Sequence, residues 1–178
     1  MKSYREMIQT FDTIAYHHLQ INSFHSGYMD EVDINKLDLK DYAILYVEPS
    51  TATLDTGTLV YTFNVYVLDR VNDETHSDFA DNSEQDERRL NMGRMDIFSE
   101  NLRILKDVIN EFKHSMYLSD PATNKSGTYT PSESILETPI NIEPFTARFN
   151  NLLTGWSAQL NIQVNNTNDL CISPITEP

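Results

Sequence analysis

The chain has 178 residues, of which 39% are hydrophobic, which suits one domain that buries its own core without a disulfide or a structural metal. Acidic residues outnumber basic ones by 27 to 13, and the resulting net charge of −14 argues against a protein that grips DNA or RNA. The single cysteine, Cys171, excludes an intrachain disulfide, and no stretch approaches the roughly 18 apolar residues of a membrane span.

Residues 3–20 are predicted to form a helix, because their apolar residues recur at three- and four-residue steps. This stripe comprises Tyr4, Met7, Ile8, Phe11, Ile14, Ala15, His18 and Leu19. Ser3 and Glu6 match a capping box, in which each side chain bonds the backbone N–H of the other. We interpret the stripe as core packing, with a partner-binding helix as the alternative. No signal-peptide pattern precedes it, so we expect a soluble protein made in a cytoplasm.

A hairpin is predicted next, after a loop at residues 21–41. Residues 42–49 are an apolar run closed by a proline, which is typical of a strand buried on both faces. A polar turn is predicted at residues 50–57. Residues 58–71 alternate between apolar and polar and predict a long second strand, antiparallel to the first.

A second helix is predicted after a polar, acidic connection at residues 72–87, starting near Ser83 or Asp86 and ending at Met116. Its stripe is the strongest periodic signal in the chain and comprises Phe98, Leu102, Leu105, Ile109, Phe112 and Met116, and Ile97, Ile104 and Val108 widen this face. Gly93 weakens the early part of this helix and marks either a kink or its true start.

The C-terminal part is predicted to hold a second hairpin, at residues 140–149, with an interruption at Pro144, and at residues 154–164. The order helix, hairpin, helix, hairpin predicts an α+β sandwich, in which two helices pack on an antiparallel or mixed sheet. One domain spans the whole chain, with a long loop insertion at about 117–139 and an extended tail at about 165–178.

Motifs for nucleotide and metal binding are missing. The five glycines, at positions 27, 57, 93, 127 and 155, are isolated, which excludes a glycine-rich phosphate loop. His17 and His18 are adjacent on a helix and point about 100° apart, so they face one metal poorly. The acidic residues between Asp69 and Glu87 lack the glycine and the alternation of a calcium loop. We expect no cofactor and no metal.

Catalytic constellations are also missing. No G-x-S-x-G pattern occurs, and nothing singles out one pair of carboxylates among the 27 acidic residues. We therefore expect a protein without enzymatic activity. A hydrolase whose site is scattered along the sequence is the alternative that this pattern leaves open.

Some residues are better suited to contacts between subunits. Four arginines gather in and before the second helix, where they could meet an acidic patch on a neighbouring copy. The alternative is pairing along the helix, for example Arg103 with Asp107. A tryptophan in the last strand is either an interface residue or part of the core. The candidate interface residues are Arg88, Arg89, Arg94, Arg103, Tyr129 and Trp156.

The order of several short phrases resembles a known family. These are Tyr46-Val47-Glu48-Pro49, Leu68-Asp69-Arg70-Val71, Leu102 to Val108, Phe145-Thr146-Ala147-Arg148-Phe149, Gly155-Trp156-Ser157-Ala158 and Cys171-Ile172-Ser173-Pro174. Together they resemble phage tail-terminator or head–tail connector proteins, as encoded by crAss-like phages. The resemblance covers nearly the whole chain, and residues 117–139 look like an insertion.

The resemblance implies a tail-terminator-like domain that forms a closed ring, with six or twelve copies, in the neck or tail of a virion. Portal, connector or tail proteins would be its neighbours, and DNA would pass through the ring without specific binding. Assembly would take place in the cytoplasm of the host bacterium, with no membrane partner. The alternative, motivated by the acidity of the chain, is a soluble adaptor or inhibitor that binds a basic host or phage protein.

Overall fold

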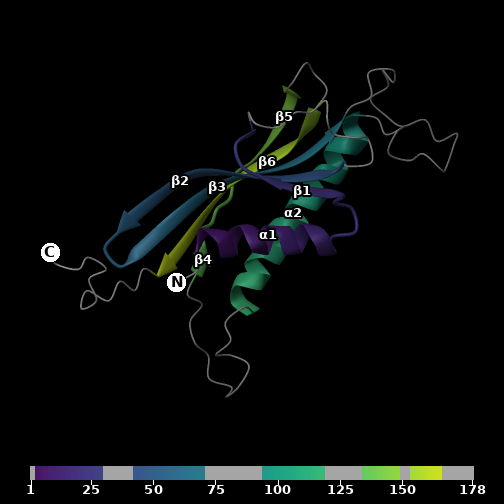
Figure 1. The fold of residues 1–178 in the computed structure, drawn as a ribbon. Helices are drawn as coiled ribbons and strands as arrows, with labels where there is room; N and C mark the ends of the chain where they lie inside the picture. The colour runs from purple at the N-terminus through teal and green to yellow at the C-terminus, as the bar shows by residue number, and fades with distance from the viewer. Residues whose placement is uncertain (1–2, 30–41, 71–93, 119–133, 149–152, 166–178) are drawn as a thin grey trace, which may run out of the picture.

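The structure, a computed structural model, describes residues 3–29, 42–70, 94–118, 134–148 and 153–165, and all contacts given below refer to these ranges. Within them the chain forms two helices and six strands (Figure 1). In chain order these are α1 (Tyr4–His17), β1 (Ser23–Ser26), β2 (Ile44–Asp55), β3 (Thr58–Arg70), α2 (Arg94–Leu118), β4 (Ser134–Leu136), β5 (Ile142–Arg148) and β6 (Leu153–Asn165).

The six strands form one mixed sheet in the order β1-β2-β3-β6-β4, and β5 also pairs with β6. The β1–β2 pair is parallel, and the other four pairs are antiparallel. The two predicted hairpins, β2–β3 and β5–β6, are both present. The expectation of an α+β fold, with a mixed sheet packed by two helices, is therefore confirmed.

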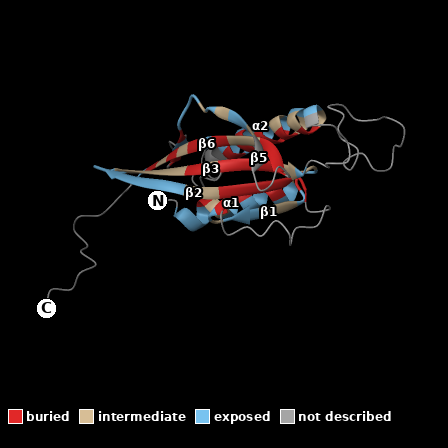
Figure 2. Cartoon of the chain, turned by 90° about the horizontal axis from the view of Figure 1, so that it is seen from above, coloured by how far each residue is buried: buried red, intermediate tan, exposed pale blue. Residues whose placement is uncertain are grey.

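Both helices cover the same face of the sheet and form the main core with it (Figures 1 and 2). The rings of Phe11 in α1 and Phe112 in α2 are stacked, with their centroids 4.2 Å apart. Phe11 also meets the ring of Phe63 in β3 edge-on. The sheet contributes the side chains of Leu45, Val47, Phe63, Val65, Val67, Ala158, Leu160, Ile162 and Val164 to this core.

The opposite face of the sheet carries a second, smaller cluster. It consists of Met29, Tyr42, Ile44, Tyr46, Tyr66, Leu68 and Leu153, with Phe145 packed against it. The first four residues of β2 are consequently buried on both faces, as the apolar run at 42–49 predicts.

The start of α1 follows the sequence prediction, and its end does not. Ser3 and Glu6 form the predicted capping box. The helix stops at His17 instead of continuing to residue 20, because the backbone of His18 is extended. The chain then turns toward the sheet, where the Asn22 N–H donates to the carbonyl oxygen of Ala43.

Two segments that we predicted as loops contain strands. β1 lies within 21–41, and β4 lies within 117–139. Both are short, and each is stabilised by one long neighbour, β2 or β6. Such strands carry too few residues for an alternating pattern to identify them.

The predicted turn at residues 50–57 is also wrong. β2 runs on to Asp55, and the turn is confined to Thr56 and Gly57. Gly57 has a φ of 80°, which glycine adopts without the steric cost that a Cβ brings. Pro49 does not end β2, because β1 pairs only as far as Val47 and leaves the proline on an edge strand.

The remaining boundaries are partly outside the described residues. α2 is described from Arg94 to Leu118, so the predicted start near Ser83 or Asp86 lies outside them. β5 continues through Pro144, which is tolerated in an edge strand. The predicted tail beyond Asn165 lies outside the described residues.

Candidate assembly interface

The β2–β3 hairpin and the end of β6 project past the helices as a three-stranded arm (Figure 1). We define the arm as residues 49–62 and 159–165, in which β3 pairs with both β2 and β6, with one register shift between Pro49 and Thr51. Every residue from Ser50 to Gly57 is exposed, and Figure 2 shows the outer part of β2 in the exposed colour. The outer end of the β2–β3 hairpin is thus left uncovered by the helix layer, whereas Ile162 and Val164 of β6 belong to the main core.

The arm is nearly free of charge. Asp55 is the one charged residue in 49–62 and 159–165, whereas 22% of the whole chain is charged. Copies of a chain with a net charge of −14 repel each other. Because the arm is nearly uncharged, a contact between two arms adds little to this repulsion.

The apolar face of the arm continues beyond the part of it that is covered. Ala52, Tyr61, Ile162 and Leu136 form one row across the strands, and Leu54, Leu59 and Val164 lie in the next row. Burial falls along each row toward β2. Ile162 and Val164 are fully buried, Tyr61 and Leu59 are half-buried, and Leu54 is 67% exposed. At β2, each row ends in an apolar residue that is exposed to solvent, Ala52 in one row and Leu54 in the other.

The outer edge of β2 is paired at its base and, as far as the described strands go, open along the arm. β1 pairs with β2 over Ile44–Val47, and among the described strands none pairs with the outer side of Pro49–Asp55. Natural edge strands are protected by charges, prolines or bulges. Here Pro49 and a register shift before Thr51 protect the base of the arm. The stretch from Thr51 to Leu54 carries no such protection.

The opposite edge of the sheet is formed by β5 and β4, which follow one another along β6. Ile135 of β4 is 53% exposed. Ile135 pairs with Gln163 of β6, Gln163 pairs with Val60 of β3, and Val60 pairs with Thr53 of β2, so Ile135 and Thr53 lie in one row across the sheet. The two edges of the arm therefore lie at the same level along the strands.

The six interface residues predicted from the sequence do not lie on the arm. Arg88, Arg89 and Tyr129 are outside the described residues, and Arg94 begins α2, with its side chain also outside them. Arg103 pairs with Glu100 at 3.5 Å, instead of with Asp107. The indole N–H of Trp156 donates to the Phe98 carbonyl oxygen at 2.8 Å, and its ring packs against the main core.

The arm edge, which sequence reasoning missed, left a weak signal. Threonine, a residue that favours strands, occupies positions 51, 53, 56 and 58. Threonine is also common in polar turns, so the pattern alone predicts a turn at this segment.

A second surface feature is a groove of about 480 Å³ between the C-terminal half of α1 and the middle of α2. Its walls are formed by Thr10, Thr13, Ile14, His17, His18, Asp107 and Glu111. The groove lies on the helix layer, away from the arm, which projects beyond the N-terminal end of α1 (Figure 1).

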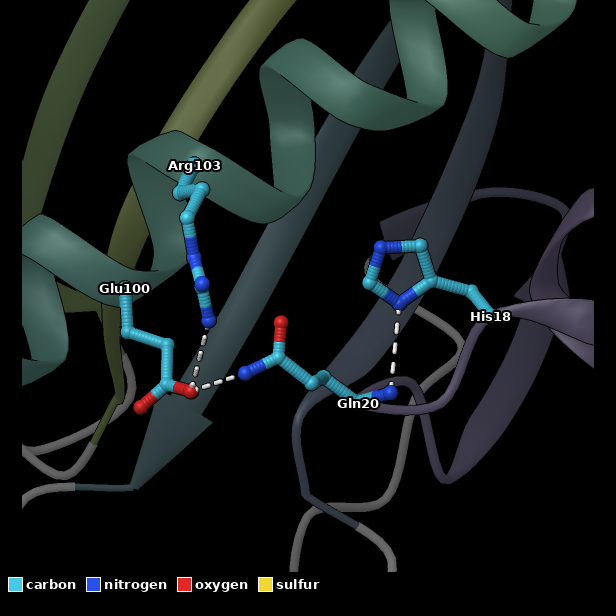
Figure 3. Close-up of polar contacts among 4 residues, drawn as sticks. All are labelled: His18, Gln20, Glu100 and Arg103. Atoms are coloured by element: carbon cyan, nitrogen blue, oxygen red, sulfur yellow. Dashed lines mark hydrogen bonds and ion pairs between the residues drawn. The ribbon is translucent and has the colours of Figure 1, made fainter.

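A polar network beside the groove fixes the side chains near it (Figure 3). The carboxylate of Glu100 accepts a hydrogen bond from the Gln20 side-chain amide and pairs with Arg103. The Gln20 backbone N–H donates to Nδ1 of His18 at 3.2 Å. Burial lowers the pKa of His18, and the nearby Asp107 opposes this shift while Arg103 adds to it.

The part of the chain that the structure describes holds no group of three or more His, Cys, Asp or Glu side chains arranged to bind a metal ion. None of its helices is long and apolar enough to cross a membrane. Cys171 lies outside the described residues.

Comparisons with known proteins identify no relative: no protein-family model and no curated sequence matches the chain.

Proposed function

We propose that this chain is a repeated structural subunit that assembles edge to edge into a closed ring, in the neck or tail of a phage virion. One observation carries this proposal: a nearly uncharged arm whose apolar rows end, exposed, at a strand edge that no described strand pairs with. Exposed edges of this kind pair readily with another strand. A ring in which each edge meets the next copy leaves none of them open.

The strand directions support head-to-tail pairing. β3 is antiparallel to β2, β6 is antiparallel to β3, and β4 is antiparallel to β6. β4 therefore runs antiparallel to β2. Where copies are related by rotation about an axis along the strands, β4 of one copy meets β2 of the next in antiparallel orientation. Thr53 and Ile135, which share a row, then lie near each other across the junction.

The composition of the outer face of the arm is consistent with a channel that DNA traverses. This face carries Thr51, Thr53, Thr62, Asn161 and Gln163, which are polar and uncharged, together with Val60 and one acidic residue, Asp55. Thr62 donates a hydrogen bond to the side-chain oxygen of Asn161 at 3.1 Å, so part of this polar surface is already satisfied. A surface without arginine or lysine offers no phosphate-binding cations. We propose that six or twelve copies turn this face toward the channel, between portal, connector or tail proteins.

Electron microscopy of the purified protein at high concentration tests the assembly, and mass spectrometry of purified virions tests the location. We expect closed rings of uniform copy number in the micrographs and the chain among the structural proteins of the virion. A protein that stays monomeric at every concentration would contradict the ring. Its absence from virions would contradict the neck or tail assignment.

A soluble adaptor that binds a basic protein is the second candidate function. The observation that favours it is the groove between α1 and α2, whose α2 wall carries Asp107 and Glu111. A monomer that retains one basic host protein on an affinity column would support the adaptor over the ring.

A further inference from the structure

We propose that the groove between α1 and α2 binds an arginine side chain presented by a partner protein. This inference goes beyond ring assembly and does not depend on it, because the groove belongs to the helix layer and shares no residue with the arm. Four features of the groove support the proposal.

The first feature is an available carboxylate. Asp107 lies four residues after Arg103 on α2, a spacing at which the two side chains commonly pair. Arg103 instead pairs with Glu100, which the Gln20 amide also holds (Figure 3). Among the described residues the Asp107 carboxylate has no hydrogen bond and no ion pair with Arg103, and it acts on the neighbouring His18, whose pKa it raises against the effect of burial. The network around Glu100 thus engages the cation that lies four residues from Asp107 on the same helix.

The second feature is a further carboxylate at the right spacing. Glu111 lies one helical turn beyond Asp107, and both line the groove; the Glu111 carboxylate also lies 3.8 Å from Nδ1 of His114, in an exposed contact that leaves its second oxygen for a ligand. Side chains four residues apart on a helix have Cβ atoms about 5–6 Å apart. The planar guanidinium group has five N–H donors and matches two such acceptors better than the single ammonium group of lysine.

The third feature is the opposite wall, which suits the apolar stem of an arginine. Ile14 lines the groove together with Thr10 and Thr13. The hydroxyls of both threonines donate to carbonyl oxygens of their own helix, at 2.8 Å. They therefore leave no free proton to compete with the guanidinium donors. Arginine packs its methylene groups on such surfaces while its charged end pairs with carboxylates.

The fourth feature is size combined with charge. A volume of about 480 Å³ accommodates one long side chain with part of its backbone and is too small for a folded domain. The acidic wall and the net charge of −14 repel phosphates and other anions. A guanidinium group on a neighbouring protein surface is the ligand that satisfies both conditions.

The test is a methyl NMR titration of the full chain, since methyl signals remain visible in large assemblies. Ile and Thr methyl groups are labelled, and Ile14, Thr10 and Thr13 report on the groove. The probe is N-acetyl-arginine N-methylamide. N-acetyl-citrulline N-methylamide serves as the neutral control, because it has nearly the same shape and no charge. We expect saturable shifts of the three groove methyls with the arginine probe, and binding about tenfold weaker with citrulline.

Two variants with the same change of charge sharpen the test. Asp107→Asn removes the available carboxylate and should weaken arginine binding about tenfold. Asp12→Asn removes an exposed carboxylate of α1 outside the groove and should leave binding unchanged. Equal binding of arginine and citrulline, or unchanged binding in Asp107→Asn, would overturn the proposal. Arginine shifts spread evenly over all methyl groups would overturn it too, because they indicate general charge attraction alone.

Discussion

Asn101 lies on the stripe of α2 that faces the sheet, between Ile97 and Ile104, and is 1% exposed. Neither its side-chain nitrogen nor its side-chain oxygen has a hydrogen-bond partner among the described residues. A buried polar group without a partner costs about 1–3 kcal/mol of stability. The buried amide of Asn101 therefore lowers the free energy of unfolding.

Replacing this side chain with an apolar one of similar size should stabilise the protein. Asn101→Leu is expected to raise the free energy of unfolding by about 1–3 kcal/mol, measured by urea denaturation, because the unpaired amide is removed. Asn110→Leu, at an exposed position of the same helix, is the matched control and should change stability by less than about 0.5 kcal/mol. A less stable Asn101→Leu variant would show that the amide is satisfied in solution.

His18 should make folding depend on pH. Burial lowers its pKa below the ordinary value of 6.5, so the unfolded chain binds this proton more readily than the folded one. Its contribution to stability is therefore complete above about pH 6.5 and is lost as the pH falls toward the lower folded pKa. Protonation of Nδ1 would also break the bond from the Gln20 N–H.

The variant His18→Asn tests this dependence, because the asparagine oxygen still offers an acceptor to the Gln20 N–H. Urea midpoints measured from about pH 7.5 to about pH 5.5 should fall less steeply in this variant than in the wild type. Parallel pH profiles of the two proteins would exclude His18 as the source.

At the scale of the elements, the close approach of β3 and β6 depends on Gly155. A Cβ at this position would lie 1.9 Å from the Val67 carbonyl oxygen and 3.2 Å from the Phe145 ring. Gly155→Ala should therefore cost about 2–3 kcal/mol of unfolding free energy, through displacement of paired strands. At Gly57 a Cβ meets nothing within 4 Å, and its positive φ alone should make Gly57→Ala cost about 1 kcal/mol. Equal costs in a denaturation experiment would contradict this account of Gly155.

The arm is the element on which assembly depends in our proposal. Leu54→Lys places a charge in the exposed apolar row of the arm and should abolish ring formation. The free energy of unfolding should change by less than about 0.5 kcal/mol, because Leu54 is exposed. Leu19→Lys is the matched control, because Leu19 is also exposed and follows the C-terminal end of α1, whereas the arm projects beyond its N-terminal end (Figure 1). Sedimentation velocity distinguishes the outcomes. Rings that persist in Leu54→Lys, or that vanish equally in Leu19→Lys, would contradict a specific role for the arm.

The long elements could be predicted from sequence, because many residues contribute to each pattern. The stripe of α2 identifies the helix, and Ile97, Ile104 and Val108, which widen it, are buried as predicted. The polar Asn101 lies in the middle of the same buried face, where a pattern of apolar residues does not register it. β1 and β4 escaped prediction because their stability comes from pairing with distant residues, which sequence patterns do not reveal.

At the scale of the whole molecule, the two-layer arrangement follows from the order of the elements, and the candidate interface does not. The arm is recognisable only when burial is known. In the sequence, Leu54 and Leu59 both look like ordinary strand residues, but in the structure Leu54 is exposed and Leu59 is half-buried. Likewise, the pairing of Arg103 with Glu100 instead of Asp107 depends on Gln20, which is 80 residues away from Glu100 in the chain. Contacts of this kind decide where a surface is open to a partner.

Disulfide trapping between the two edges of the arm tests the proposed assembly most directly. Thr53→Cys and Ile135→Cys are combined in a chain in which Cys171→Ser removes the native thiol, since both positions are exposed and share one row. In head-to-tail rings, oxidation should link β2 of each copy to β4 of the next. Denaturing gels should then show a ladder that ends at one closed oligomer, while each single-cysteine variant remains monomeric. Absence of the ladder, or dimers formed by Thr53→Cys alone, would contradict edge-to-edge assembly into a ring.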